Sequence, residues 1–181
     1  EVARIILAAN GLENVYVVET TGELTDHYDP TRKVVKLSKE IFHGESIASV
    51  AVAAHECGHA IQDKENYKFM RIRSILVPVV NLVSYLGYFA VIIGLLAGAT
   101  GYLLAGIITL VATVIFQLVT LPVEFDASRR AKEELLKLQL VDSDVEVSSM
   151  LSAAAFTYVA SLLSSLLNLL RLILMFSKRD D

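Results

Sequence analysis

The sequence has a single cysteine and lacks long basic runs, and two of its long stretches carry no charge. Cys57 is the one cysteine in 181 residues, so the chain can form no internal disulfide. The formal net charge is −4 and no basic run exceeds two residues, which makes nucleic acid an unexpected partner. Residues 75–97 and 102–121 contain no charged side chain, and 54% of all residues are apolar. This composition is typical of a membrane protein.

The two charge-free stretches predict a transmembrane helical hairpin. Each has the roughly twenty residues needed to cross a hydrocarbon core, and the link 98–101 is too short for anything but antiparallel neighbours. The outer ends of the hairpin then lie on the same side of the membrane. Basic residues flank both ends: Lys68, Arg71, Arg73, Arg129, Arg130 and Lys132. By the positive-inside rule we expect an integral membrane protein with these ends in the cytoplasm.

Residues 1–74 predict a membrane-peripheral segment with two helices around two strands. Apolar periodicity and the Asn-Gly stop favour a helix over 1–10, and a second helix is expected over 45–64. Strands are predicted over 15–19 and 33–37, because both are rich in β-branched residues. A long turn with Gly, Asp and Pro separates them. The two strands are therefore expected to pair as a small antiparallel hairpin.

Residues 122–181 predict two further helices. A polar helix should run from Glu124 to about residue 139, and a long apolar helix from 144 to 177. Ser143 and Glu146 form a capping box that opens the second of these. A polar stripe along it is either a packing seam or the lining of a wet cavity, and the helix either spans the membrane or lies in the interface. The segments 1–74, 75–121 and 122–181 are expected to form one functional domain.

The segment His55-Glu56-Cys57-Gly58-His59 is an HExxH motif on a predicted helix. Residues four apart share a helix face, so His55 and His59 can bind one Zn²⁺ ion. Glu56 lies beside that face and can act as a general base for a metal-activated water. The competing interpretation is two core histidines hydrogen-bonded beside a buried glutamate, but an apolar helix has little reason to bury these groups without a metal.

A catalytic zinc needs a third protein ligand and one open position. The histidines outside the motif, His27 and His43, lie on no element that the sequence directs at the motif. Glu124 is the better candidate, because the hairpin returns the chain there to the side that it left. Asp126 is the rival, but it faces a different side of the same helix and both cannot bind directly.

Four segments together resemble one family: "AVAAHECGHAIQ", "TLPVEFDASRRA", "LTDHYDP" and "AAAFTYVASLL". In the order in which they occur along the chain, they are similar to the bacterial YugP-type membrane zinc metallopeptidases, over nearly the whole chain, and this resemblance implies a prokaryotic cell membrane. Members usually begin with one further transmembrane helix, so we expect this sequence to be a piece of a longer protein. The family in turn resembles the HtpX-like and CAAX-prenyl-protease-like gluzincins, in which HExxH pairs with a glutamate in an E-x-x-x-D setting.

That resemblance implies a zincin-like helical core and assigns Glu124 as the third ligand. Ser128 stands where the wider group has an Asp that orients a ligand histidine, so Ser128 or Asp126 would take that role here. His27 or Tyr28 is a candidate donor to the oxyanion of the reaction, and Tyr158 is a second candidate; turn chemistry and helix packing are the plainer explanations. Strand 33–37 is a candidate edge for an extended peptide substrate.

We therefore expect a mainly α integral membrane fold and a zinc-dependent endopeptidase with one Zn²⁺ ion. His55, His59 and Glu124 would bind the metal, and Glu56 would be the general base. Substrates would be peptides or membrane proteins at the lipid bilayer. A zinc-binding membrane scaffold without peptidase activity is the alternative, and a structural membrane protein with a chance motif is a second. A metal transporter is disfavoured, because the hairpin carries no ionisable residue.

Overall fold

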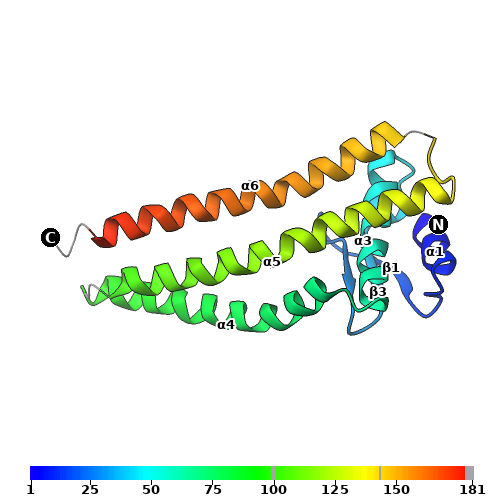
Figure 1. The fold of residues 1–181 in the computed structure, drawn as a ribbon. Coiled ribbons are helices and arrows are strands. Elements are labelled where there is room, and N and C mark those ends of the chain that lie inside the picture. Colours follow the sequence, from blue (N-terminus) through cyan, green and yellow to red (C-terminus); the bar gives the residue numbers. More distant parts are fainter. Residues whose placement is uncertain (99–100, 143, 178–181) are drawn as a thin grey trace. The chain divides into compact units, whose positions relative to one another are not determined.

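The computed structural model describes residues 1–98, 101–142 and 144–177 (Figure 1). Six helices and three strands lie within these ranges. In chain order they are α1 (Val2–Ala9), β1 (Tyr16–Thr20), β2 (His27–Asp29), β3 (Val34–Ser38), α2 (Lys39–His43), α3 (Ile47–Lys64), α4 (Lys68–Leu96), α5 (Tyr102–Lys137) and α6 (Asp144–Ser177). The prediction of a mainly α fold with a small sheet is confirmed.

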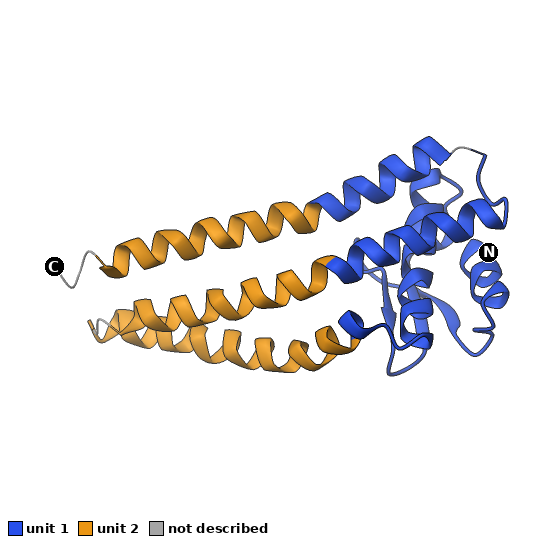
Figure 2. Ribbon diagram, in the orientation of Figure 1, with its two compact units in different colours: residues 1–70, 122–156 blue, residues 71–121, 157–181 orange. Residues whose placement is uncertain are grey.

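The chain divides into two compact units (Figure 2). The first contains Glu1–Met70 and Pro122–Phe156, and the second contains Arg71–Leu121 and Thr157–Asp181. The first unit holds the sheet, the short helices and α3, together with one end of α5 and of α6. All residues of the HExxH motif and the polar part of α5 therefore belong to one unit.

The second unit consists of long apolar helical segments. Helices α4, α5 and α6 are each long and apolar enough to cross a membrane. Many of their large apolar side chains are exposed, among them Ile75, Leu96, Leu163 and Leu170. Such surfaces suit contact with lipid rather than with water.

The sheet is mixed, so the predicted antiparallel hairpin is wrong. Strand β1 pairs with β3 in parallel, from Tyr16 opposite Val34 to Thr20 opposite Ser38. The segment expected as a bare turn contains β2, which pairs with the other side of β3 in antiparallel register. Parallel neighbours need a crossover connection, and β2 lies within it. Because β3 is the central strand, it does not offer the free edge that we expected for a peptide substrate.

Two aspartates fold the β2 segment locally. The Asp26 carboxylate accepts hydrogen bonds from the Ser38 amide and hydroxyl, which ties the start of β2 to the end of β3. The Asp29 carboxylate accepts from the amides of Thr31 and Arg32 and forms the turn into β3. Side chains that bond to nearby backbone in this way are the reason why aspartate favours turns. Here they place a strand where composition alone indicated only a turn.

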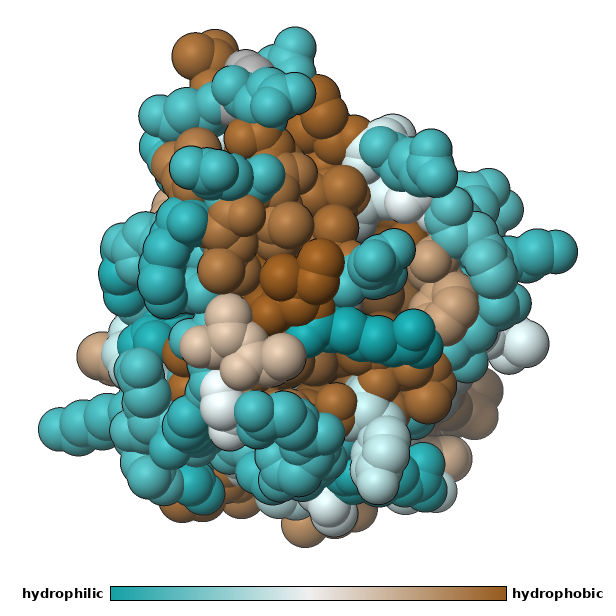
Figure 3. All heavy atoms as spheres, turned by 90° about the vertical axis from the view of Figure 1, so that its right-hand side faces the viewer, coloured by the Kyte–Doolittle hydropathy of each residue, from teal (hydrophilic) through white to brown (hydrophobic). Residues whose placement is uncertain are grey.

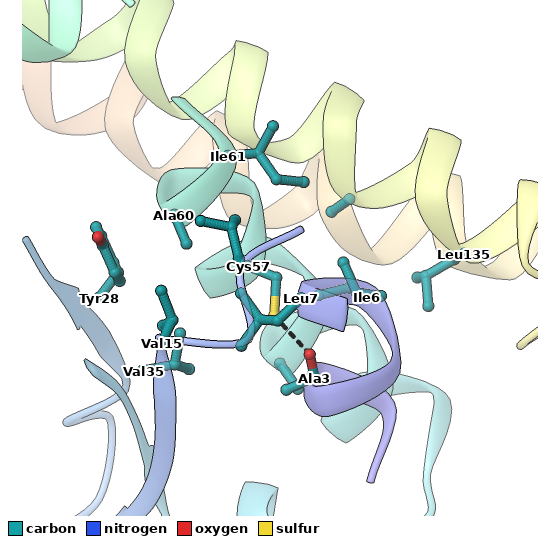
Figure 4. Packing of buried hydrophobic residues seen from close by; sticks show 14 of the residues in the cluster. Ala3, Ile6, Leu7, Val15, Tyr28, Val35, Cys57, Ala60, Ile61 and Leu135 are labelled. Carbon is teal, nitrogen blue, oxygen red and sulfur yellow. Dashed lines mark hydrogen bonds between the residues drawn. The ribbon is translucent and has the colours of Figure 1, made fainter. Parts of the chain in front are cut away.

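Helix α3 lies in the core of the first unit (Figure 4). It begins after Ser46, whose hydroxyl accepts a hydrogen bond from the Ser49 amide, slightly later than predicted. The Cys57 thiol is fully buried and contacts the Ala3 carbonyl of α1. Ala60 and Ile61 are buried on the same helix. Cys57 is therefore a small core residue, on the side of α3 that faces α1.

On the face seen in Figure 3, hydrophilic side chains surround an apolar area. The core of the first unit includes fully buried Ile6 from α1, Val35 from β3 and Leu135 from α5. This core joins segments that are far apart in the sequence. It fixes α3, and one end of α5, in a common framework.

Helix α5 is continuous where we expected a break. Pro122 lies inside it, and Glu124 is in the interior of the helix rather than at its start. A proline removes one backbone donor but does not end a helix when both flanks keep helical geometry. Helix α4 likewise contains Pro78, and it begins at Lys68, ahead of the charge-free stretch 75–97. Ser143 of the predicted capping box lies outside the described residues; its partner Glu146 is in the first turn of α6.

Candidate metal centre

Three side chains from α3 and α5 meet at one point. The Nε2 atom of His55 lies 3.1 Å from Glu124 Oε2, and that of His59 lies 3.6 Å from the same oxygen. One donor atom from each residue lies within 4.8 Å of the other two. Glu124 is 1% exposed and His59 8%. The structure thus brings together the three residues that the sequence nominated as metal ligands.

The chemistry of this cluster requires a cation or a proton between its members. Two imidazole nitrogens face one buried carboxylate oxygen, and lone pairs in that arrangement repel each other. Burial alone would lower the pKa of His59, but the hydrogen bond to Glu124 and the charges of Glu56 and Glu124 raise it above the ordinary histidine value. Two imidazoles and one carboxylate are also the protein donor set of a catalytic zinc site. The residues present therefore fit Zn²⁺.

Gly58 allows α3 and α5 to approach closely beside the cluster. A Cβ atom at Gly58 would lie 2.5 Å from the Ala127 carbonyl oxygen and 3.1 Å from its Cα. Both of those atoms are backbone, so no side-chain rotation could relieve the clash. Glycine in a helix interior costs about 1 kcal/mol relative to alanine. Here the missing Cβ is what lets Glu124 reach the two histidines.

Both histidines have polar partners on their second ring nitrogen. His55 Nδ1 lies 3.1 Å from the Ser128 hydroxyl. His59 Nδ1 lies 3.0 Å from Gln62 Oε1. Partners of this kind orient ligand rings. Ser128 thus contacts His55, as we expected for one of the two candidate residues.

Sequence reasoning missed Gln62. It follows His59 by three residues, so it lies on the same side of α3, and it is fully buried. Asp126, the other candidate, contacts Gln62 through its carboxylate 2.9 Å from Nε2. A buried glutamine one turn beyond a ligand histidine was the signal that could have identified it, because a buried amide must find partners.

The remaining candidates lie as follows. Glu56 is 8% exposed and follows His55 directly on α3. His27 is exposed on β2, and its Nδ1 lies 2.7 Å from the Thr25 carbonyl oxygen. Its neighbour Tyr28 is buried and donates to Asp63, one turn beyond His59 on α3. Tyr158 is on α6, in the second unit.

Comparison with known proteins points the same way as the geometry. Residues 1–177 match the family described as "Putative neutral zinc metallopeptidase". The chain is 47% identical over 183 aligned residues to the "Putative membrane protease YugP" of Bacillus subtilis (strain 168), with all of this chain and 81% of that protein covered. No solved structure matches it. With a family match over nearly its whole length and a relative of this identity, the chain belongs to this zinc metallopeptidase family.

Proposed function

We propose that this protein is a zinc-dependent endopeptidase that cleaves peptides or membrane proteins at the bilayer. The observation that carries the proposal is the His55, His59 and Glu124 cluster, with Glu56 adjacent to it, in a chain of a zinc metallopeptidase family. Its relative is named a membrane protease, and three helices of the chain can span a membrane. Both facts support a substrate near the lipid.

Three residues of the cluster would bind the metal, and Glu56 would transfer the proton. His55, His59 and Glu124 would hold one Zn²⁺, which when bound polarises the scissile carbonyl and makes water a stronger acid. Glu56 takes a proton from the attacking water on its carboxylate and passes it to the nitrogen of the leaving amine. Burial of Glu56, His59 and Glu124 limits their contact with bulk water, which strengthens the electrostatic interactions among them.

Three further residues have proposed roles. Ser128 would orient the His55 ring through the contact with Nδ1. His27 and Tyr158 are the candidate hydrogen-bond donors to the oxyanion. His27 is exposed on β2, and the next residue of that strand, Tyr28, donates a hydrogen bond to Asp63 of α3. The basic residues that flank the hairpin support a site on the cytoplasmic side of the membrane.

The decisive experiment replaces Glu56 by Gln in the purified full chain. Zinc content, measured by mass spectrometry, should stay at the wild-type level while hydrolysis of peptide substrates is lost, because the amide cannot accept the proton. Glu13→Gln removes a carboxylate from an exposed position and should change neither property. Activity retained by Glu56→Gln would refute the role of this residue. Zinc binding without hydrolysis by the wild-type protein would instead favour the scaffold alternative.

A further inference from the structure

The buried amide of Gln62 connects α3 to α5 on the far side of His59 from Glu124. Its side chain is fully buried and makes three hydrogen bonds. Oε1 lies 3.0 Å from His59 Nδ1, and Nε2 lies 2.8 Å from the Val123 carbonyl oxygen and 2.9 Å from Asp126 Oδ2. Both N–H groups of Nε2 therefore have an acceptor.

These partners determine which way the amide points. A carbonyl oxygen and a carboxylate can only accept, so the NH₂ group of Gln62 must face Val123 and Asp126. Oε1 then faces His59, and an amide oxygen can only accept as well. His59 Nδ1 must therefore carry a proton, so the neutral ring has its lone pair on Nε2, the nitrogen that faces Glu124. That is the tautomer a metal ligand requires.

Asp126 holds the amide from the other side. Its carboxylate pairs with Arg129 and Arg130, and Arg130 also pairs with Glu65 just beyond the end of α3. The Asp126 oxygen is therefore fixed before it meets Gln62. A fixed acceptor that is charged forms a stronger hydrogen bond than a neutral one. The chain of contacts runs from the arginines through Asp126 and Gln62 to His59.

The same amide also acts on the third ligand. Val123 precedes Glu124 directly, and its carbonyl is the acceptor for Gln62. One side chain of α3 thus bonds to a ligand histidine and to the α5 backbone beside the ligand glutamate. His55 has a different arrangement, because the Ser128 hydroxyl can donate or accept and does not impose one tautomer.

We infer that Gln62 is a positioning residue for the metal site: with Asp126 behind it, it fixes the tautomer of His59 and sets the distance between His59 and Glu124. The inference rests on the proposed zinc site. It concerns how the ligands are held, and it does not require that the protein be a peptidase.

The test measures zinc binding and the histidine tautomer in the full chain. Gln62→Met keeps the size of the side chain and removes all three bonds. Its affinity for zinc alone, measured by competition with a chromophoric chelator at fixed pH, should fall about 10- to 100-fold, the range for lost partners of ligand histidines. Gln117→Met is the matched control, because Gln117 Oε1 is buried and accepts no hydrogen bond among the described residues.

Nitrogen NMR of the zinc-free protein, recorded at a pH high enough that the histidine rings are neutral, reports on the tautomer directly, and only four histidines need to be assigned. His59 should be protonated on Nδ1 in the wild type and in Gln62→Glu, whose carboxylate still accepts from Nδ1. In Gln62→Met it should become a mixture of both tautomers. A purely structural role of Gln62 would not separate these two variants. Gln62→Glu should still bind zinc less tightly than the wild type, since it cannot donate to Val123 or Asp126, and it serves as the test if Gln62→Met fails to fold.

Coupling to Asp126 is tested by a double substitution. Asp126→Asn should weaken zinc binding, and it should cause no further loss once Gln62 is already Met, because the path to His59 is then broken. Additive losses would overturn the coupling. Wild-type affinity and an unchanged His59 spectrum in Gln62→Met would overturn the inference as a whole. A wild-type protein that binds no zinc would refute the proposed function, while the tautomer of the zinc-free protein would still test the role of Gln62.

Discussion

The close approach of α3 and α5 at Gly58 makes Gly58→Ala a severe test of the proposed metal site. In most helix interiors this change is stabilising, because alanine has the higher helix propensity by about 1 kcal/mol. At Gly58 the added methyl group would stand 2.5 Å from the Ala127 carbonyl oxygen. Local preference and tertiary contact therefore oppose each other at this position.

The size of the displacement follows from that distance. A Cβ atom essentially never lies closer than 3.0 Å to a non-bonded atom, and ordinary van der Waals contacts begin at 3.4 Å. To reach these distances from 2.5 Å, the helices must separate by about 0.5 to 0.9 Å. Overpacking of this kind costs about 1–3 kcal/mol, partly offset by the gain in helix propensity. Metal–ligand distances tolerate only about 0.2 Å. Glu124 lies on α5 one turn before Ala127, so it should move out of reach of a metal held by the histidines.

Two measurements separate these effects. Gly58→Ala should change the free energy of unfolding of the zinc-free protein by at most about 2 kcal/mol, while its zinc affinity falls at least tenfold. Gly106→Ala is the control, because a Cβ there would meet two side-chain ends, Leu172 Cδ1 at 3.3 Å and Val91 Cγ2 at 3.9 Å, and no backbone atom of another described segment lies within 4 Å. If Gly58→Ala bound zinc as tightly as the wild type, the close contact would not be needed for the site, and the reasoning would fail.

Two further outcomes follow from the same cluster. Glu124→Ala should abolish stoichiometric zinc, as measured by mass spectrometry, since it removes the carboxylate that both histidines face; if Asp126→Ala alone did so, Asp126 would be the ligand instead. Zinc affinity should fall as the pH drops, by about one logarithmic unit per pH unit for each proton displaced. Because Glu124 and Glu56 raise the pKa of His59 against the effect of burial, this fall should begin above pH 6.5, and an affinity independent of pH between about 6 and 8 would contradict it.

Local patterns predicted most elements of this fold. Apolar periodicity and the Asn-Gly stop placed α1, and Gly11 does adopt the left-handed conformation, with φ of 62°. The long apolar stretches became α4, α5 and α6. Each of these signals depends on residues close together in the sequence. The HExxH spacing is of the same kind, which is why His55 and His59 could be placed on one helix face from the sequence.

The sheet could not be predicted in the same way. Two strands close in sequence favour a hairpin, but parallel pairing of β1 with β3 depends on how the connecting segment packs. That segment contains β2, whose Tyr28 is buried and donates to Asp63 of α3. A three-residue strand has too short a pattern to be recognised, and its position is decided by a contact with a helix that comes later in the chain. Gln62 was missed for the same reason, because its partners lie on α5.

Two residues that disfavour helices lie inside the two helices that form the metal site. Gly58 is within the HExxH motif, and Pro122 is two residues before Glu124. Taken by local rules, each weakens its helix. The missing Cβ of Gly58 instead admits the α5 backbone, and the Pro122 carbonyl accepts a hydrogen bond from the Tyr67 hydroxyl at 3.5 Å. Departures from local preference are expected where a site needs a contact that ordinary helix packing does not allow. In this chain they occur where α3 and α5 must be closest for three ligands to share one ion.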